Sequence, residues 1–141
     1  PNGYDGEDFK GLINQRNGQD KFVITHTGTL YGKRNLTEFL EGLKIAIEGN
    51  HVNREDIEIR FVGNVHESVE KYNLQGKIKT TGYMNHRDSI QMLYNSDILL
   101  LIIGKVKGAE NFYSGKIFEY IRADRPVLAI VPEGGAAAEV I

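Results

Sequence analysis

The chain has 141 residues, of which 40% are hydrophobic and 26% are charged, with a net charge of −2 and no cysteine. Its length fits one domain with a substantial core, and its composition is that of a soluble globular protein. The small negative charge argues against a duplex nucleic-acid binder, and the lack of cysteine excludes disulfides and thiolate metal sites. No apolar run approaches the ~18 residues that span a bilayer.

Residues 1–20 are polar and rich in turn dipeptides, which predicts a lead-in segment held to the domain by a few apolar side chains. Residues 21–141 are expected to form the domain itself. The chain starts at Pro1 without methionine and stops in a helical pattern at Ile141, so we expect it to be a piece of a longer protein. With no cysteine and no recognisable signal peptide, we expect that protein to be cytoplasmic.

Short apolar runs alternate with amphipathic stretches, which predicts alternating strands and helices. The expected strands are residues 21–26, 57–62, about 77–81, 98–103 and 127–131. Helices are expected after Asn35 up to Gly49, through Val65, Val69 and Tyr72 up to Gly76, from Asn85 to Asn95, and from about Gly115 to Ala123. Asn35 with Glu38 and Asn85 with Asp88 have the spacing of capping boxes.

The run Ile98–Ile103 is apolar throughout, without polar alternation. Such a strand is typical of a parallel sheet covered on both faces, so we place it near the middle of the sheet. The whole pattern predicts an α/β, Rossmann-like three-layer domain with a parallel sheet. If the strand order is 3-2-1-4-5, the exit loops of the first and fourth strands line one crevice, where ligands of such sheets bind.

Both of these loops combine glycine with cations. Gly28 is followed by Lys33 and Arg34 in one loop, and the run Ser114-Gly115-Lys116 lies in the other. Glycine lets backbone N–H groups approach an anion, and helix N-termini and cations attract it, so the pair of loops is typical of a phosphate site. The alternative is that Lys33 and Arg34 are a solvated surface pair and that Ser114 only caps its helix.

Glu119 follows in an apolar stretch of the last predicted helix. A carboxylate there can accept hydrogen bonds from two ribose hydroxyls, as acidic groups do in nucleotide sites. The alternative is a weak surface pair with Lys116 three residues earlier.

Other motifs are missing or weak. The four histidines lack metal-ligand spacing, and His26 at the end of the first strand is more typical of a structural histidine than of a ligand contact. The sequence has no serine-hydrolase elbow and no Walker pattern, and the loop at Gly28 lacks the third glycine of a dinucleotide fingerprint.

Four stretches resemble the C-terminal, donor-binding domain of GT-B fold glycosyltransferases, in particular the retaining family 4 enzymes (glycosyl transferases group 1). They are Pro1–Asp5 with Phe9, Gly28–Asn35, Gly82–Met84 through Tyr94–Asp97, and Ser114–Tyr120 through Arg125–Val127. The likeness covers nearly the whole chain, and the last stretch is the most specific.

The chain departs from the family pattern at two places. Thr29 stands where the family's first diphosphate-binding arginine is usual, so anion binding would depend on Arg34 with Lys33 beside it. The family's first acid would fall at Asn111, one residue after Glu110, which leaves the sugar-contacting role open between these two. Glu119 matches the second acid, whose implied role is to hold the ribose.

The resemblance implies transfer of a sugar from a nucleotide-diphosphate sugar to an acceptor hydroxyl with retention of configuration, without a metal or other cofactor. The implied catalytic residues are Arg34 and Glu110, and the implied donor-binding residues are Gly28, Thr29, Lys33, Arg34, Asn111, Ser114, Gly115, Lys116 and Glu119. The acceptor, a glycan or a lipid-linked glycan in surface polysaccharide synthesis, would bind a missing N-terminal domain. The fragment alone is therefore expected to bind nucleotide without turnover, and the full-length protein to work in the cytoplasm with room for docking at the inner face of the membrane.

Two alternatives remain. A nucleotide-sugar epimerase of related fold would use a similar donor domain, and its product would distinguish it from a transferase. A non-catalytic flavodoxin-like or receiver-like binding module is the other; a receiver needs an acidic cluster where this chain has Thr25-His26-Thr27.

Overall fold

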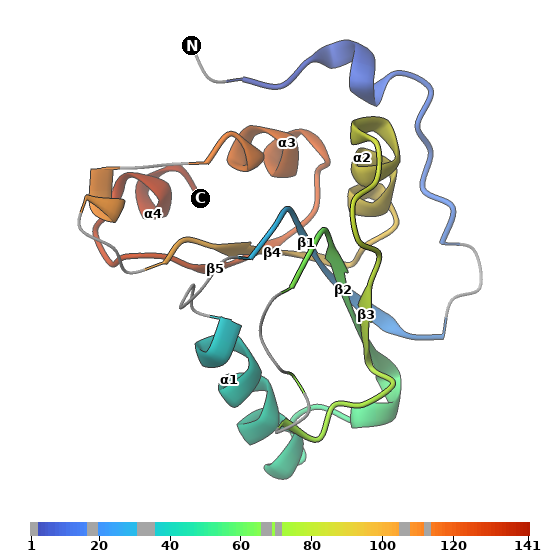
Figure 1. Cartoon of the computed structure of the whole chain (residues 1–141), viewed down its shortest axis with the longest axis vertical. Helices are drawn as coiled ribbons and strands as arrows, with labels where there is room; N and C mark the ends of the chain where they lie inside the picture. Colours follow the sequence, from blue (N-terminus) through green and yellow to red (C-terminus); the bar gives the residue numbers. More distant parts are fainter. Residues whose placement is uncertain are drawn as a thin grey trace.

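The computed structural model describes residues 3–16, 20–30, 36–65, 69, 72–104, 108–111 and 114–141. Its centre is a five-stranded sheet in the order β3-β2-β1-β4-β5, in which all neighbouring strands are parallel (Figure 1). The strands are β1 (Phe22–Thr27), β2 (Ile57–Val62), β3 (Ile78–Thr80), β4 (Ile98–Ile102) and β5 (Val127–Ile130). The Rossmann-like fold, the strand order and the approximate strand positions are confirmed.

The helices follow the expected pattern closely. They are α1 (Leu36–Glu48), α2 (His86–Tyr94), α3 (Lys116–Arg122) and α4 (Ala136–Val140), with 3₁₀ turns η1 (Gly6–Phe9), η2 (Arg54–Asp56) and η4 (Ala109–Asn111). The predicted cap of α2 is confirmed, because the Asn85 side chain accepts a hydrogen bond of 2.9 Å from the Asp88 backbone N–H. The other predicted cap, Asn35, lies outside the described residues.

The helix expected from Val65 onward does not begin there. Val65 forms a parallel bridge with Leu30, which extends the contact between the segments that leave β1 and β2. Val65 therefore continues the extended backbone beyond β2, and an apolar residue in that conformation looks the same in sequence as one at a helix start. Much of the stretch that follows, residues 66–68 and 70–71, lies outside the described residues.

Two apolar clusters cover the two faces of the sheet. β4 contributes to both, with Leu100 and Ile102 in the cluster that includes α1, and Leu99 and Leu101 in the cluster that includes α2 and α3. Burial on both faces explains why this strand is apolar at every position, since successive side chains of a strand point to opposite faces.

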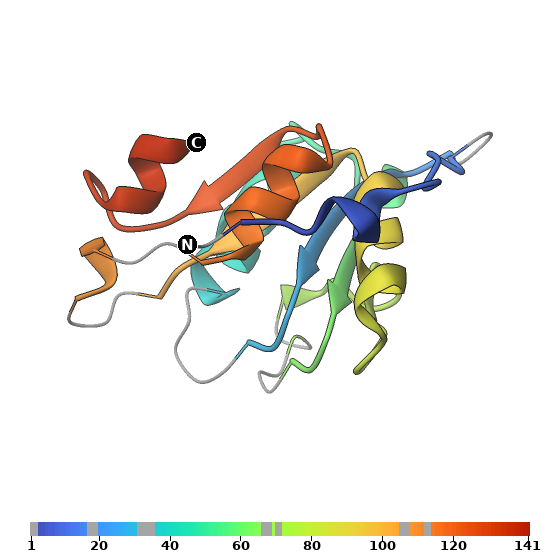
Figure 2. The ribbon, with the colours of Figure 1, turned by 90° about the horizontal axis from the view of Figure 1, so that it is seen from above.

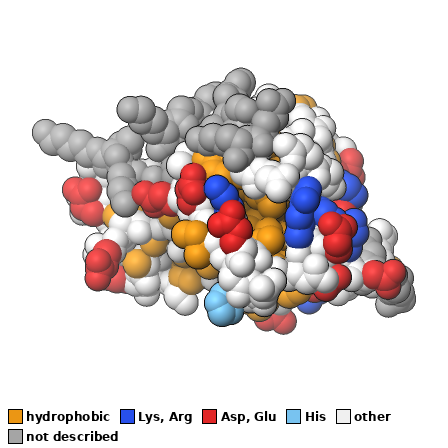
Figure 3. Space-filling view, turned by 90° about the horizontal axis from the view of Figure 1, so that it is seen from below, with side chains coloured by type: hydrophobic (Ala, Val, Ile, Leu, Met, Phe, Trp, Pro, Cys, Tyr) orange, Lys and Arg blue, Asp and Glu red, His pale blue; other side chains and the backbone are white. Residues whose placement is uncertain are grey.

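α1 presents its other face to solvent. Ile45 is exposed there, and Lys44 and Glu48 form an exposed pair 4.0 Å apart. In Figure 3, which views the molecule from the side on which α1 lies, acidic and basic side chains are interspersed with hydrophobic ones among the coloured residues. This mixture differs from the one-signed basic surface typical of duplex-binding proteins.

The lead-in segment lies across α2 and α3 on the outside of the domain (Figures 1 and 2). Phe9 of η1 is only 4% exposed and belongs to the cluster of α2 and α3, and the Arg122 guanidinium lies 5.3 Å from the centre of its ring. Arg87 of α2 donates a 2.7 Å hydrogen bond to the Lys10 carbonyl. These contacts fix η1 and Lys10 on the domain surface near the start of α2.

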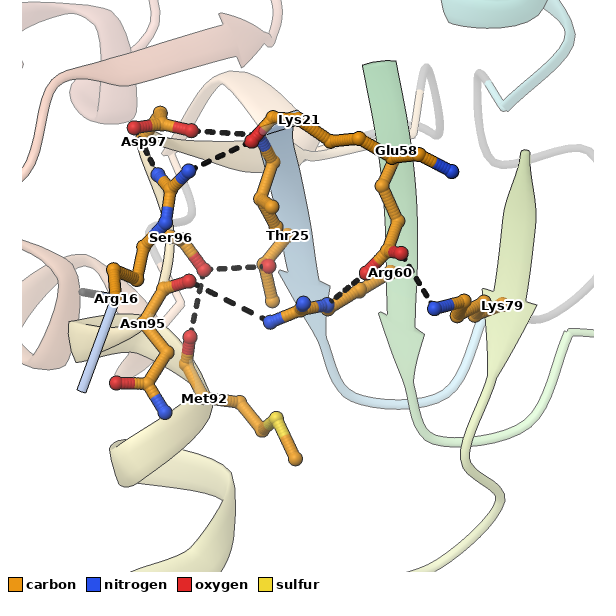
Figure 4. Close-up of polar contacts among 11 residues, drawn as sticks. Arg16, Lys21, Thr25, Glu58, Arg60, Lys79, Met92, Asn95, Ser96 and Asp97 are labelled. Atoms are coloured by element: carbon orange, nitrogen blue, oxygen red, sulfur yellow. Dashed lines mark hydrogen bonds and ion pairs between the residues drawn. The ribbon is translucent and has the colours of Figure 1, made fainter. Parts of the chain in front are cut away.

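Polar side chains tie the turn between α2 and β4 to the sheet (Figure 4). Ser96 Oγ lies 2.6 Å from both Thr25 Oγ1 and the Met92 carbonyl oxygen, so its hydroxyl can donate to the carbonyl and accept from the Thr25 hydroxyl. Asp97 accepts a 2.7 Å hydrogen bond from the Val23 backbone N–H. Buried polar groups need such partners, and here they set the register between β1 and the start of β4.

A charged cluster lies on the same face at β2 and β3 (Figure 4). The Glu58 carboxylate is 2.5 Å from Arg60 Nε and 2.5 Å from Lys79 Nζ. Burial raises the pKa of Glu58, but the hydrogen bonds from Lys79 and Arg60 outweigh it and leave the pKa below its ordinary value. Glu58 therefore remains ionised although its side chain is largely buried.

Candidate functional site

β1 and β4 are neighbours, so their carboxyl ends lie at one edge of the sheet. Ile24 pairs with Ile98 and Thr25 with Leu99 in parallel register. The turns that leave these two strands therefore lie side by side, as the predicted topology requires.

Tyr120 of α3 joins the two strand ends. Its hydroxyl accepts a 3.0 Å hydrogen bond from the Thr27 backbone N–H and donates one of 3.3 Å to the Leu100 carbonyl. Burial raises the pKa of Tyr120 to about 12, so the phenol is neutral and able to donate. This hydroxyl holds α3 over the boundary between β1 and β4.

Gly28 and Lys116 meet at this boundary. The Gly28 N–H donates to the Val62 carbonyl at 2.7 Å, and its φ of +105° is one that residues with a side chain rarely adopt. A Cβ atom added at Gly28 would lie 2.5 Å from both Cε and Nζ of Lys116. The Lys116 amino group therefore lies directly against the backbone of the β1 exit.

The exit of β2 packs against the same glycine. A Cβ atom at Gly63, where φ is +136°, would lie 2.6 Å from the Gly28 carbonyl oxygen. The Leu30 N–H donates a 3.0 Å hydrogen bond to the Asn64 carbonyl just beyond this contact. Close backbone contact at glycines thus forms the floor of the site.

A cleft of about 280 Å³ opens beside this floor. Its walls come from the exits of β1, β2 and β3 and from the first turns of α2, and consist of Gly28, Thr29, Val62, Gly63, Gly82, Tyr83, Met84, His86 and Ser89. Tyr83 is 91% exposed, so an aromatic ring projects into solvent from one wall of the cleft. An open pocket with an aromatic wall and a few polar groups is typical of a small-molecule site.

Glu119 faces two other elements. Its carboxylate Oε1 lies 3.7 Å from His86 Nε2, and the same nitrogen lies 3.1 Å from Asp8 Oδ2 of η1. Burial raises the pKa of Glu119, while His86 and Lys116 act to lower it. A half-buried carboxylate close to the cleft is in a position to accept hydrogen bonds from hydroxyl groups of a ligand.

The remaining predicted residues fall into two groups. Ser114 Oγ accepts a 3.3 Å hydrogen bond from the Lys116 N–H at the start of α3, but the N-cap position itself is taken by Gly115, which is exposed and makes no side-chain cap. Glu110 and Asn111 lie exposed on η4, whose backbone packs against Gly135 at the start of α4.

Lys33 and Arg34 lie outside the described residues, so their predicted roles stay predictions. His26 is 2% exposed, and its Nδ1 lies 2.9 Å from the Leu100 carbonyl, an arrangement typical of a structural histidine. Within the described part of the chain, no group of three or more histidine or acidic side chains is arranged to hold a metal ion. None of the described helices has the length and apolarity needed to cross a bilayer.

Sequence reasoning missed the wall formed by Tyr83, Met84, His86 and Ser89. In the sequence, the Gly82–Met84 segment stands out only as part of a family resemblance. Its position after the third strand is a usable signal, because all strands of a parallel sheet end at one edge.

Comparison with known proteins shows similarity in structure only. No protein-family model and no curated protein matches the sequence. The solved C-terminal domain of LpcC, a glycosyl transferase group 1 family protein of Francisella tularensis, is similar with a TM-score of 0.63 and 15% identity, over 90% of this chain and 70% of that one. Anabaena HepE, solved with UDP and glucose, gives 0.65 and 16% over 99% of this chain. The pneumococcal O-GlcNAc transferase GtfA, solved with UDP and GlcNAc, gives 0.61 and 14% over 87%.

These identities are low, so the likeness establishes the fold, which is the Rossmann-like fold of domains found in glycosyltransferases. The chain spans only 37% of the length of HepE and 23% of the length of GtfA.

Proposed function

We propose that this chain is the donor-binding half of a GT-B glycosyltransferase and that it binds a nucleoside-diphosphate sugar at the carboxyl ends of its strands. The observation that carries the proposal is the contact of Gly28, at the exit of β1, with Lys116 of α3, next to a cleft that Gly28 shares with His86, the neighbour of Glu119. A glycine backbone, an ammonium group and a carboxylate at one edge of the sheet supply what phosphates and ribose hydroxyls need.

The diphosphate is proposed to lie against Gly28 and Thr29. Lys116 supplies a full positive charge there, since its amino group lies against the Gly28 backbone. Arg34 and Lys33, which follow in the same loop, are proposed to supply further cations, and Ser114 and Gly115 the start of the helix. Charge-assisted hydrogen bonds of this kind are about twice as strong as neutral ones.

The nucleoside is proposed to occupy the cleft beside the diphosphate. The walls at Gly82, Tyr83 and Met84 suit a planar base, with an exposed ring and backbone amides beside it. Glu119 is proposed to accept hydrogen bonds from the ribose hydroxyls, a role that requires the ionised carboxylate.

In the proposed reaction, negative charge develops on the β-phosphate as the sugar leaves with retention of configuration. Arg34 and Lys116 stabilise that charge without a bound metal, and each fixed donor of this kind is worth roughly 2.7–4 kcal/mol. Glu110 or Asn111 contacts the sugar. The acceptor binds a further domain, so the activity belongs to a longer protein than this chain.

Isothermal titration of the chain with UDP, GDP and ADP tests the proposal. One of the three is expected to bind, and Lys116→Ala, Arg34→Ala and Glu119→Ala are each expected to weaken it by about 10–100-fold, the value of a hydrogen bond to a charged group. Lys10→Ala and Glu7→Ala are matched controls, because these side chains are exposed and pair with each other on η1. Absence of binding at millimolar nucleotide, or unchanged affinity in the Lys116 and Glu119 variants, would refute the proposal.

A further inference from the structure

The side chains of Asp8, His86 and Glu119 lie close together although they are far apart along the chain. Asp8 comes from η1, His86 begins α2 and Glu119 lies on α3. His86 Nε2 lies 3.1 Å from Asp8 Oδ2 and 3.7 Å from Glu119 Oε1, so one ring nitrogen lies close to two carboxylates. His86 therefore lies between Glu119, the candidate ribose ligand, and Asp8 of the lead-in segment. His86 also lines the cleft.

The start of α2, which carries His86, and η1, which carries Asp8, are both held in place. The backbone of His86 follows the Asn85 cap, whose side chain accepts from the Asp88 N–H. Asp8 belongs to η1, which is anchored by the buried Phe9 and by the hydrogen bond from Arg87 to the Lys10 carbonyl. The two elements that carry Asp8 and His86 are therefore fixed next to each other.

We propose that His86 is a positioning residue for Glu119: Asp8 orients the imidazole, and the imidazole keeps the Glu119 carboxylate turned toward the ribose. This inference rests on the proposed nucleotide site and assigns a residue that the sequence pattern did not single out. It also makes Asp8 of the lead-in segment part of the site, because Asp8 acts on Glu119 through His86.

The charges around Glu119 agree with this role. Burial disfavours the charged carboxylate, Asp8 of η1 adds to that effect, and His86 of α2 and Lys116 of α3 oppose it. The His86 imidazole lies between Asp8 and Glu119 and counteracts the effect of the Asp8 carboxylate on Glu119. Without it, the pKa of Glu119 is expected to rise further, and the carboxylate would protonate at a higher pH.

The test uses the 141-residue chain and whichever of UDP, GDP and ADP binds to it. His86→Gln is expected to weaken binding of that nucleotide about tenfold near neutral pH. This is the value of one hydrogen bond from a ribose hydroxyl to the Glu119 carboxylate. The affinity of the unchanged chain is expected to fall on acidification as Glu119 protonates, and in His86→Gln this fall moves to higher pH. His51→Gln, at an exposed histidine of the turn after α1, is the matched control.

Two further measurements separate positioning from other roles. In a Glu119→Gln background, His86→Gln is expected to have no additional effect, because its target is gone. The 2′,3′-dideoxy analogue of the same nucleotide, which lacks the ribose hydroxyls, is expected to bind His86→Gln and the unchanged chain equally.

The outcomes are distinct. If no nucleotide binds the unchanged chain, the proposed function itself fails. If the unchanged chain binds nucleotide and Glu119→Gln lowers that affinity, but His86→Gln leaves the affinity and its pH dependence unchanged, only the proposed role of His86 is wrong. Equal weakening of the nucleotide and its dideoxy analogue by His86→Gln would show that the imidazole acts elsewhere and would overturn the inference. Far-UV circular dichroism and urea unfolding confirm that each variant is folded.

Discussion

Gly63, Gly28 and Gly42 differ in backbone conformation and in the atoms next to them, so substitution of each by alanine is expected to change the stability by a different amount. At Gly63 the φ is +136° and the new Cβ would lie 2.6 Å from the carbonyl oxygen of Gly28, a backbone atom that cannot rotate away. At Gly28 the φ is +105°, but the clash is with the flexible end of Lys116. At Gly42, inside α1, the Cβ meets no atom within 4 Å.

The expected changes in unfolding free energy follow from these differences. Gly63→Ala incurs backbone strain of about 1–3 kcal/mol and a packing clash of similar size, about 2–6 kcal/mol in all. Gly28→Ala incurs the backbone strain alone, about 1–3 kcal/mol, because Lys116 can move aside. Gly42→Ala is expected to stabilise the protein by about 0.5–1 kcal/mol, since alanine is the better helix former.

Urea unfolding followed by far-UV circular dichroism measures all three, with midpoints compared where the slope is unchanged. Nucleotide titration of Gly28→Ala adds a second readout, because a displaced Lys116 is expected to weaken binding. Equal stability of Gly63→Ala and Gly42→Ala would refute the close backbone contact between the exits of β1 and β2. A greater loss for Gly28→Ala than for Gly63→Ala would show that Lys116 is rigidly held.

Three further predictions concern buried polar groups. Tyr120→Phe leaves the Thr27 N–H without its acceptor and is expected to cost about 1–3 kcal/mol in urea unfolding. Because folding raises the pKa of Tyr120, its contribution to the free energy of unfolding is fully present below the ordinary pKa of 10.0 and is lost as pH rises toward about 12. The difference in unfolding free energy between the unchanged chain and Tyr120→Phe therefore narrows over that pH window. Glu58→Gln is expected to cost about 1.5–3 kcal/mol at neutral pH, because it loses two charge-assisted hydrogen bonds. Because folding lowers the pKa of Glu58, its contribution to the free energy of unfolding is fully present above the ordinary pKa of 4.5 and disappears as pH falls through the lower pKa of the folded state. Urea unfolding at a series of acidic pH values measures this loss. Ser96→Ala, measured in the same way, is expected to cost about 1 kcal/mol and to show coupling with Thr25→Val.

Each of these has an outcome that contradicts it. A constant stability difference between Tyr120→Phe and the unchanged chain up to pH 12 would mean that the phenol ionises as it does in water. A Glu58→Gln difference that grows on acidification would reverse the expected sign. Additive effects of Ser96→Ala and Thr25→Val would show that the two hydroxyls do not share a hydrogen bond.

Much of the fold could be predicted because it depends on neighbours in sequence. The apolar run Ile98–Ile103 indicated a strand buried on both faces, and Asn85 with Asp88 indicated the start of α2. In both cases the signal lies within one turn or one strand, where periodicity and capping reflect backbone geometry directly. The alternation of such elements then favoured a parallel sheet, and the handedness of its connections left few strand orders.

What the sequence by itself determined is therefore most of the elements, the edge of the sheet at which a ligand is expected, and the residue types gathered there. Only the tertiary structure decided which side chains meet. Tyr120 reaches the end of β1, Lys116 covers Gly28, and Asp8 meets His86 and Glu119, although these partners lie far apart along the chain. The packing of α2, α3 and the lead-in segment on one face of the sheet sets these distances, and no local pattern of residues encodes how three separate elements pack together.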